Sequence, residues 1–206
     1  NNFIKDKLSA NLTFYKIINN NLAQTAQFTA DGITPNNNIA LKELAGQTTS
    51  NEIELDINAQ LVKGLNILAG YSFNNMRYTK TKKAKGNYIE GERLINTPTH
   101  TANSSAFYTF NKGALKGLKL GVAGFYTGDR LGGWNNTQGQ AQNYNRLIPV
   151  IGFTTFDLSA GYCYKKITLL VKLSNLMNTH NYNVHENYSI NPIAPREIIS
   201  TLSVKF

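Results

Sequence analysis

The stretch SNEIELDINAQL, residues 50–61, decides the fold of this chain. Its apolar residues occupy every second position: Ile53, Leu55, Ile57, Ala59 and Leu61. The positions between them carry acidic or amide side chains: Glu52, Glu54, Asp56, Asn58 and Gln60. Successive side chains of an extended segment point to opposite sides. The alternation therefore predicts a β-strand with one apolar face and one hydrated face.

The same alternation recurs along the chain. Seven further segments have it: 7–17, 65–78, 100–110, 117–128, 153–164, 167–178 and 196–206. Strands of soluble sheets average about 5–6 residues, whereas these segments have the length of a tilted strand that crosses a bilayer, about 10 residues. We therefore expect an all-β chain with about eight long transmembrane strands.

The connections between these segments alternate between short and long. The short ones are VKG, NKGALK and KK, and the long ones cover about 18–50, 79–99, 129–152 and 179–195. Outer-membrane barrels have tight periplasmic turns and long extracellular loops. The pattern predicts an antiparallel up-and-down β-barrel of the bacterial outer membrane, with its first strand rising from the periplasm.

Aromatic residues support this orientation. Rising strands carry them late, which predicts an outer interface band of Phe14, Tyr71, Phe73 and Tyr126. Descending strands also carry them late, which predicts an inner band of Tyr108, Phe110, Tyr162, Tyr164 and Phe206. The final stretch STLSVKF, residues 200–206, ends on this inner band. A soluble β-sandwich or binding module also alternates, but it explains neither the strand length nor these bands.

Composition narrows the possible partners. The net charge is +9, from 21 Lys and Arg against 12 Asp and Glu, but the cations are spread along the chain. We therefore expect no nucleic-acid partner. The one basic run, YTKTKKAKG at residues 78–86, is interpreted as a solvated or anion-facing loop, and the phosphates of lipopolysaccharide fit it equally well. The single Cys163 excludes an internal disulfide, and no run of about 20 apolar residues predicts a membrane helix.

No catalytic or metal-binding pattern emerges. His100, His180 and His185 lack companions with metal-site spacing, and the glycines match no dinucleotide or phosphate-loop motif. The alternating carboxylates of residues 52–56 are expected to bind water or basic neighbours such as Lys119 and Lys172. We predict no enzyme activity, no cofactor and no bound metal.

Several motifs in sequence order resemble the C-terminal part of TonB-dependent siderophore receptors. They are GERLINTPTHTANSSAFYTF, GFYTGDR, FTTFDLSAGYCY, LVKLSNLMNTHNY and NPIAPREIISTLSVKF. Ser105, Met177 and the ending SVKF depart from the usual family pattern, in which tryptophan, phenylalanine and Y-x-F are common. The chain opens without an initiator Met or a signal peptide, which predicts a processed chain or a piece of one.

This resemblance implies a barrel of 22 strands filled by an N-terminal plug, which is a further expected partner of the carboxylates of residues 52–56. Residues 1–206 would be its C-terminal segment, without the plug and the earlier strands. It also implies uptake of a ferric siderophore, energised through TonB. The expected partners are the transported siderophore, outer-membrane lipid with lipopolysaccharide, and TonB through the missing N-terminal part.

Ligand contacts are expected in the outward loops. Ferric siderophores are bulky and often aromatic or anionic, and they suit residues that stack, donate hydrogen bonds or carry positive charge. The candidates are Arg130, Trp134, Tyr144, Arg146, Tyr182, His185 and Tyr188. For each, packing within its loop is the alternative role.

A complete eight-stranded barrel with a structural or adhesin role is the alternative to a receptor segment. The two hypotheses differ in strand pairing. A closed small barrel requires the strand at Leu8–Phe14 to pair with the strand at Leu202–Phe206. In a segment of a larger barrel, the first strand pairs instead with an earlier strand.

Overall fold

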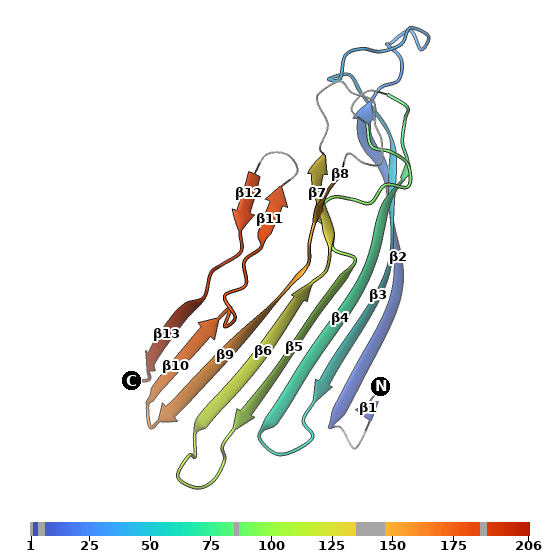
Figure 1. Ribbon diagram of the computed structural model, residues 1–206. Coiled ribbons are helices and arrows are strands. Elements are labelled where there is room, and N and C mark those ends of the chain that lie inside the picture. The colour runs from blue at the N-terminus through green and yellow to red at the C-terminus, as the bar shows by residue number, and fades with distance from the viewer. Residues whose placement is uncertain (1, 4–6, 85–86, 135–146, 186–188) are drawn as a thin grey trace.

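The computed structural model describes residues 2–3, 7–84, 87–134, 147–185 and 189–206 (Figure 1). In this part of the chain the regular elements are strands, and no helix is long and apolar enough to cross a membrane. The strands are β1 (Asn2–Phe3), β2 (Leu8–Thr25), β3 (Lys42–Ala59), β4 (Leu65–Lys80), β5 (His100–Thr109), β6 (Leu118–Thr127), β7 (Arg130–Trp134), β8 (Leu147–Val150), β9 (Phe153–Tyr164), β10 (Ile167–Ser174), β11 (Tyr182–His185), β12 (Ser189–Pro192) and β13 (Glu197–Val204).

One antiparallel sheet dominates the fold. Its strand order is β1-β2-β3-β4-β5-β6-β9-β10-β13, so that consecutive long strands lie side by side. Figure 1 shows the turns after β3, β5 and β9 at one end of the sheet and the hairpins β7–β8 and β11–β12 at the other. The prediction of about eight long antiparallel strands with alternating short and long connections is confirmed.

The sheet does not close. Among the described residues, β13 pairs only with β10, and β2 pairs with β3 and with the two residues of β1. Figure 1 places β2 and β13 at opposite edges of the sheet. A complete eight-stranded barrel requires these two strands to pair, so that alternative is wrong, and the fold is part of a larger barrel wall.

Strand register sorts the side chains onto two faces. Phe14 pairs with Ile53, Ile53 with Phe73, and Phe73 with His100, so these four side chains lie in one row on the same face. The row beside it on the other face contains Tyr15, Glu52 and Asn74. We call these the apolar face and the polar face.

The apolar face has nothing packed against it. Its large side chains are widely exposed: Leu12, Phe14, Leu120, Val122, Leu158, Leu169 and Leu202. The buried apolar residues of the described chain are Ala26, Ala59 and Tyr78, far too few for a soluble core. An exposed apolar surface of this extent requires an apolar solvent, which is the environment that a barrel wall meets in a membrane.

All nine aromatic residues predicted to form the two bands lie on the apolar side by register or by strand alternation. Tyr71 and Tyr126 flank Ala102 towards the outer end of the wall. Towards the inner end, Tyr108 pairs with Leu65 and Leu120, and its ring meets the edge of Phe110 at 4.8 Å between centroids. Their assignment to membrane interfaces stays a prediction.

Three connections and one strand end differ from expectation. β2 and β3 pair all the way to Thr25 and Lys42, so the first long connection covers only residues 26–41. Where both faces of a strand meet water, its residues need not alternate between apolar and polar. The alternation in the sequence therefore did not predict these ends of β2 and β3.

The connections 129–152 and 179–195 contain the unpredicted hairpins β7–β8 and β11–β12. β10 ends at Ser174 because Asn175 and Asn178 adopt left-handed backbone angles, φ 47° and 52°.

The two faces give a matched test on two serines at the same depth. Ser104 lies on the apolar face in the middle of β5, and the exposed Ser9 of β2 lies on the polar face in the row that runs through Asn58 and Leu68 to Ser105. We predict that Ser104→Lys lowers the free energy of unfolding by about 2–4 kcal/mol, the cost of lysine at the bilayer midplane. Ser9→Lys is expected to change it by less than about 1 kcal/mol, because that lysine reaches into the hydrated interior.

The test is urea unfolding of the whole protein in lipid vesicles, for the two variants and the unmodified protein. Equal losses for both serines would contradict the assignment of the faces.

Candidate functional site

The outer end of the wall carries the two short hairpins. β7 pairs with β8 through Arg130 with Val150 and Leu131 with Pro149, and β11 pairs with β12 from Tyr182 to His185. Figure 1 shows the hairpins rising beside one another above β6, β9, β10 and β13. The described parts of the two segments that the sequence predicts to contact a ligand, 129–134 with 147–152 and 179–185 with 189–195, therefore lie together at this end of the wall.

Arg130 ties the hairpins together. Its side chain is 5% exposed, and its Nη2 donates to Asn181 Oδ1 at 3.3 Å and to the carbonyl oxygen of Tyr182. The guanidinium carbon lies 5.6 Å from the centroid of the Phe153 ring. Asn181 completes the brace, since its Nδ2 donates to the carbonyl of Ile151 at 3.0 Å. Burial lowers the pKa of the Arg130 guanidinium, and the group is committed to packing inside the loop structure.

Gly132 allows the strands to approach closely at this junction. A Cβ atom at this position would lie 2.8 Å from Cγ2 of Val150 and 3.1 Å from Cβ of Val184. Any larger residue would push β7 away from β8 and β11. Gly132, the first of the two glycines that precede Trp134, thus serves the packing of the two hairpins.

Asn175 holds the base of the second hairpin. Its backbone N–H donates to Asp157 Oδ1 at 2.9 Å, and its Nδ2 donates to the carbonyls of Thr179 at 2.9 Å and Ala194 at 3.0 Å. The Thr179 N–H returns a bond to Asn175 Oδ1 at 2.8 Å. These bonds join both ends of the connection between β10 and β13. The sequence analysis missed this role because it assigned Asn175 to a strand.

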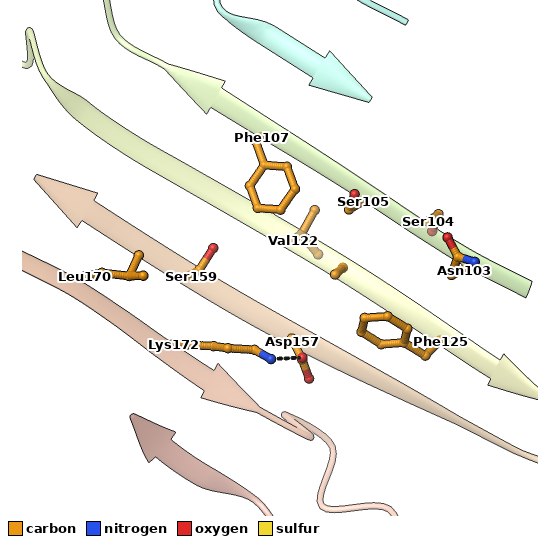
Figure 2. Close-up of a pocket in the computed structure, with 11 residues that line it drawn as sticks. Asn103, Ser104, Ser105, Phe107, Val122, Phe125, Asp157, Ser159, Leu170 and Lys172 are labelled. Atoms are coloured by element: carbon orange, nitrogen blue, oxygen red, sulfur yellow. Dashed lines mark ion pairs between the residues drawn. The ribbon is translucent and has the colours of Figure 1, made fainter. Parts of the chain in front are cut away.

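A hollow of about 360 Å³ opens on the polar face in the middle of the wall. Figure 2 shows side chains of β5, β6, β9 and β10 around it, with Phe107 and Phe125 at its sides. At its edge, Lys172 Nζ lies 2.8 Å from Asp157 Oδ2. Most of the lining surface is apolar, and its polar side chains are Asn103, three serines and the ion pair of Lys172 with Asp157. This composition accommodates an apolar side chain that carries a polar end.

Acidic side chains lie along β3 on the same face. The hydroxyl of Tyr15 lies 2.6 Å from both Glu52 Oε2 and Glu54 Oε1, and the hydroxyl of Ser50 donates to Glu52 Oε1 at 2.5 Å. Among the described residues no ion pair joins these carboxylates to Lys119 or Lys172, and Lys172 binds Asp157 instead. No group of three metal-ligating side chains occurs in the described chain.

Asp31 organises the tip of the first outer loop. Its carboxylate accepts bonds from the backbone N–H groups of Ile33 and Thr34, both at 2.9 Å, and from the hydroxyls of Thr29 and Thr34. These bonds, those of Thr34 first, lower the pKa of Asp31 well below its usual range. The carboxylate serves the local turn and is not available as a strong base.

The structure describes four of the seven residues that the sequence predicts to contact a ligand. Arg130 is buried and contacts the backbone of Tyr182, whose own side chain is 53% exposed at the surface. Trp134 and His185 are the last residues of β7 and β11. Tyr144, Arg146 and Tyr188 lie outside the described residues.

Comparison with known proteins gives the wall a family. The family described as "TonB dependent receptor-like, beta-barrel" matches residues 2–176. The "Metal-pseudopaline receptor CntO" of Pseudomonas aeruginosa is 28% identical over 180 residues. That match covers 86% of this chain and 23% of the relative, so the chain spans about a quarter of that relative's length.

Solved structures share the fold. The ferric preacinetobactin receptor BauA of Acinetobacter baumannii superimposes with a TM-score of 0.76 at 18% identity, over 98% of this chain and 28% of that receptor. The ferripyoverdine receptor of the Pseudomonas aeruginosa outer membrane gives a TM-score of 0.75 at 19% identity, over 99% of this chain and 26% of that receptor.

The contacts of Asp157 with Lys172 and with the Asn175 N–H yield a prediction on stability. Asp157→Ala removes the partner of Lys172 and of the Asn175 N–H, and we expect it to lower the free energy of unfolding by about 1–2 kcal/mol. This expected loss is smaller than the loss of a fully buried hydrogen bond to a charged group, because Lys172 is 45% exposed.

Asp56→Ala is the matched control, since Asp56 is an exposed carboxylate on the same face. It should unfold at the urea concentration of the unmodified protein. If Asp157→Ala lowers the free energy of unfolding no more than Asp56→Ala does, the structural role of the Asp157 contacts is contradicted.

Proposed function

Because the chain belongs to the TonB-dependent receptor-like β-barrel family, whose members are outer-membrane transport proteins, we propose that it is the C-terminal wall of a receptor importing ferric siderophores. Residues 1–206 would then be preceded by the plug domain and by the earlier strands of a 22-stranded barrel. The family transports its ligands and does not transform them chemically, in agreement with the prediction of no enzyme activity.

The open sheet is the observation that carries this proposal. A wall whose two edge strands lie apart needs further strands to satisfy its edge groups in lipid, where no water replaces the missing hydrogen bonds. The pseudopaline receptor is about four times as long as this chain, so a protein of that length has room for such strands. The polar face would then line the interior of the barrel and the apolar face would contact lipid and, at the outer leaflet, lipopolysaccharide.

The interior features fit a wall that encloses a plug. The hollow between Phe107 and Phe125 is open to the interior and would receive an apolar side chain of the plug. The carboxylates of Glu52 and Glu54, which have no cationic partner among the described residues, would accept bonds from basic groups of the plug.

A chelated metal ion is the substrate class that agrees with the relatives. One is named a receptor for a metal complex of pseudopaline, and two solved structures are receptors for ferric preacinetobactin and ferripyoverdine. The net charge of the chain, +9, favours an anionic chelate. The exposed Tyr182 and the end of β7 at Trp134 would meet it at the outer opening. Energy would come through TonB, which would contact the N-terminal part of the receptor.

Uptake by cells that carry the full-length receptor tests this function. We predict that such cells accumulate ⁵⁵Fe from a ferric siderophore and that removal of TonB or collapse of the proton-motive force abolishes the uptake. Trp134→Ala is expected to weaken siderophore binding about 5–30-fold, the value of one or two lost aromatic contacts.

Tyr164→Ala is the control variant, because Tyr164 lies on the apolar face at the opposite end of the wall. It should bind the siderophore as the unmodified receptor does. A receptor that inserts into the outer membrane but accumulates no ferric chelate would overturn the proposed function.

A further inference from the structure

Two arginines face each other on the outer surface of the wall. Arg77 of β4 and Arg93 of the segment before β5 form an antiparallel bridge. The ladder between β3 and β4 is regular from Phe73 to Arg77, so Arg77 points to the same side as Phe73. Four residues along a strand correspond to about 13 Å. The pair therefore lies on the apolar side of the wall, just beyond the outer aromatic residues.

This arrangement costs free energy unless an anion joins the two side chains. Directly opposed residues of an antiparallel pair have Cβ atoms about 4.5–5.5 Å apart, and like charges in this position repel. Among the residues that the structure describes, neither guanidinium has a carboxylate within 4.0 Å. Burial, and then the positive charge of Arg77, lower the pKa of Arg93, and the negative charge of Asp129 opposes this effect.

Neutral acceptors hold the two guanidinium groups in place. Arg77 donates through Nε to Asn75 Oδ1 at 2.9 Å and through Nη1 to the carbonyl of Gly91 at 2.8 Å. Arg93 donates through Nη2 to the carbonyl of Thr97 at 2.8 Å. Each guanidinium has five N–H donors, so most of the donors of the pair are left for a further acceptor. These bonds orient the side chains without neutralising them.

Lys16 adds a third cation to this surface. It lies two residues beyond Phe14 on the same face, and its row continues through Asn51 to Asn75, the residue that binds Arg77. Lys16 and Arg77 are exposed, whereas Arg93 is half-buried. The cluster of Lys16, Arg77 and Arg93 faces away from the barrel interior, so it lies off the path of a transported chelate.

We propose that Arg77 and Arg93 bind a phosphate group of the glycolipid that forms the outer leaflet of the outer membrane. The inference rests on the proposed function only in placing the apolar face in that membrane. Phosphate oxygens match the fork of a guanidinium, and two opposed forks enclose one phosphate. The phosphates of this lipid lie at headgroup level, which is the level directly beyond an aromatic band. Lys16 supplies additional attraction from the neighbouring strand.

The experiment titrates lipid onto the purified, delipidated full-length receptor and follows bound lipid by native mass spectrometry. The probes are lipid A with two phosphates and the same lipid after removal of its phosphates. We expect the unmodified receptor to bind the phosphorylated lipid at least 10-fold more tightly. Replacing both arginines, Arg77→Gln with Arg93→Gln, should remove most of this preference. Lys112→Gln with Lys116→Gln removes the same charge from exposed sites in the turn after β5, at the opposite end of the wall, and should retain it.

Several results would overturn the proposal. They are equal affinity of the unmodified receptor for both lipids, equal losses for the arginine and lysine variants, and competition by millimolar inorganic phosphate, which would indicate a site for free phosphate. If the glutamine variant fails to fold, Arg77→Lys with Arg93→Lys keeps the charge but loses the forks, and a loss of preference of several-fold is expected. Unchanged preference in that variant would also count against the site. Iron uptake measured in parallel separates the two proposals, since lipid preference persists if only the uptake function is wrong.

Discussion

The backbone's need for hydrogen bonds in a medium without water governs the rest of this structure. In the bilayer core each strand must pair on both sides, so a spanning sheet has to continue until it closes. The chain satisfies this requirement from β2 to β13 but not at its two outer edges. The alternation of apolar and polar residues, the strand length and the exposure of the apolar face all follow from a wall that separates lipid from a hydrated interior.

The functional surfaces are distributed along this wall according to depth. The interior hollow and the carboxylates of β3 lie at the level of the long strands, where a plug would pack. Above them, Arg130 and Asn181 join the hairpins β7–β8 and β11–β12 into one unit. A ligand that displaces one hairpin therefore acts on the other as well. On the opposite side of the wall, the Arg77 and Arg93 pair meets the membrane headgroups and takes no part in ligand passage.

Sequence reasoning predicted the membrane part of the fold well, because one face of every long strand meets lipid and must be apolar. The alternation of apolar and polar residues in 50–61 and in the seven further segments reflects this requirement. The extensions of β2 and β3 beyond the membrane were missed, since both faces there are hydrated and no alternation is needed. The brace by Arg130 was missed for a different reason: an arginine in a loop has the same sequence signature whether it binds a ligand or a backbone carbonyl. The opposition of Arg77 and Arg93 depends on how residues 91–99 return along β4, which no local pattern specifies.

Cysteine cross-linking of the full-length protein tests the central claim, that this chain is part of a larger barrel wall. With Cys163 replaced by serine, the pair Leu169→Cys and Leu202→Cys should form a disulfide, because these residues are direct partners on β10 and β13. The pair Leu12→Cys and Leu202→Cys should form none within one molecule, since β2 and β13 would each pair with other strands. An efficient cross-link between residues 12 and 202 would mean that the eight long strands close on themselves, and it would contradict the account.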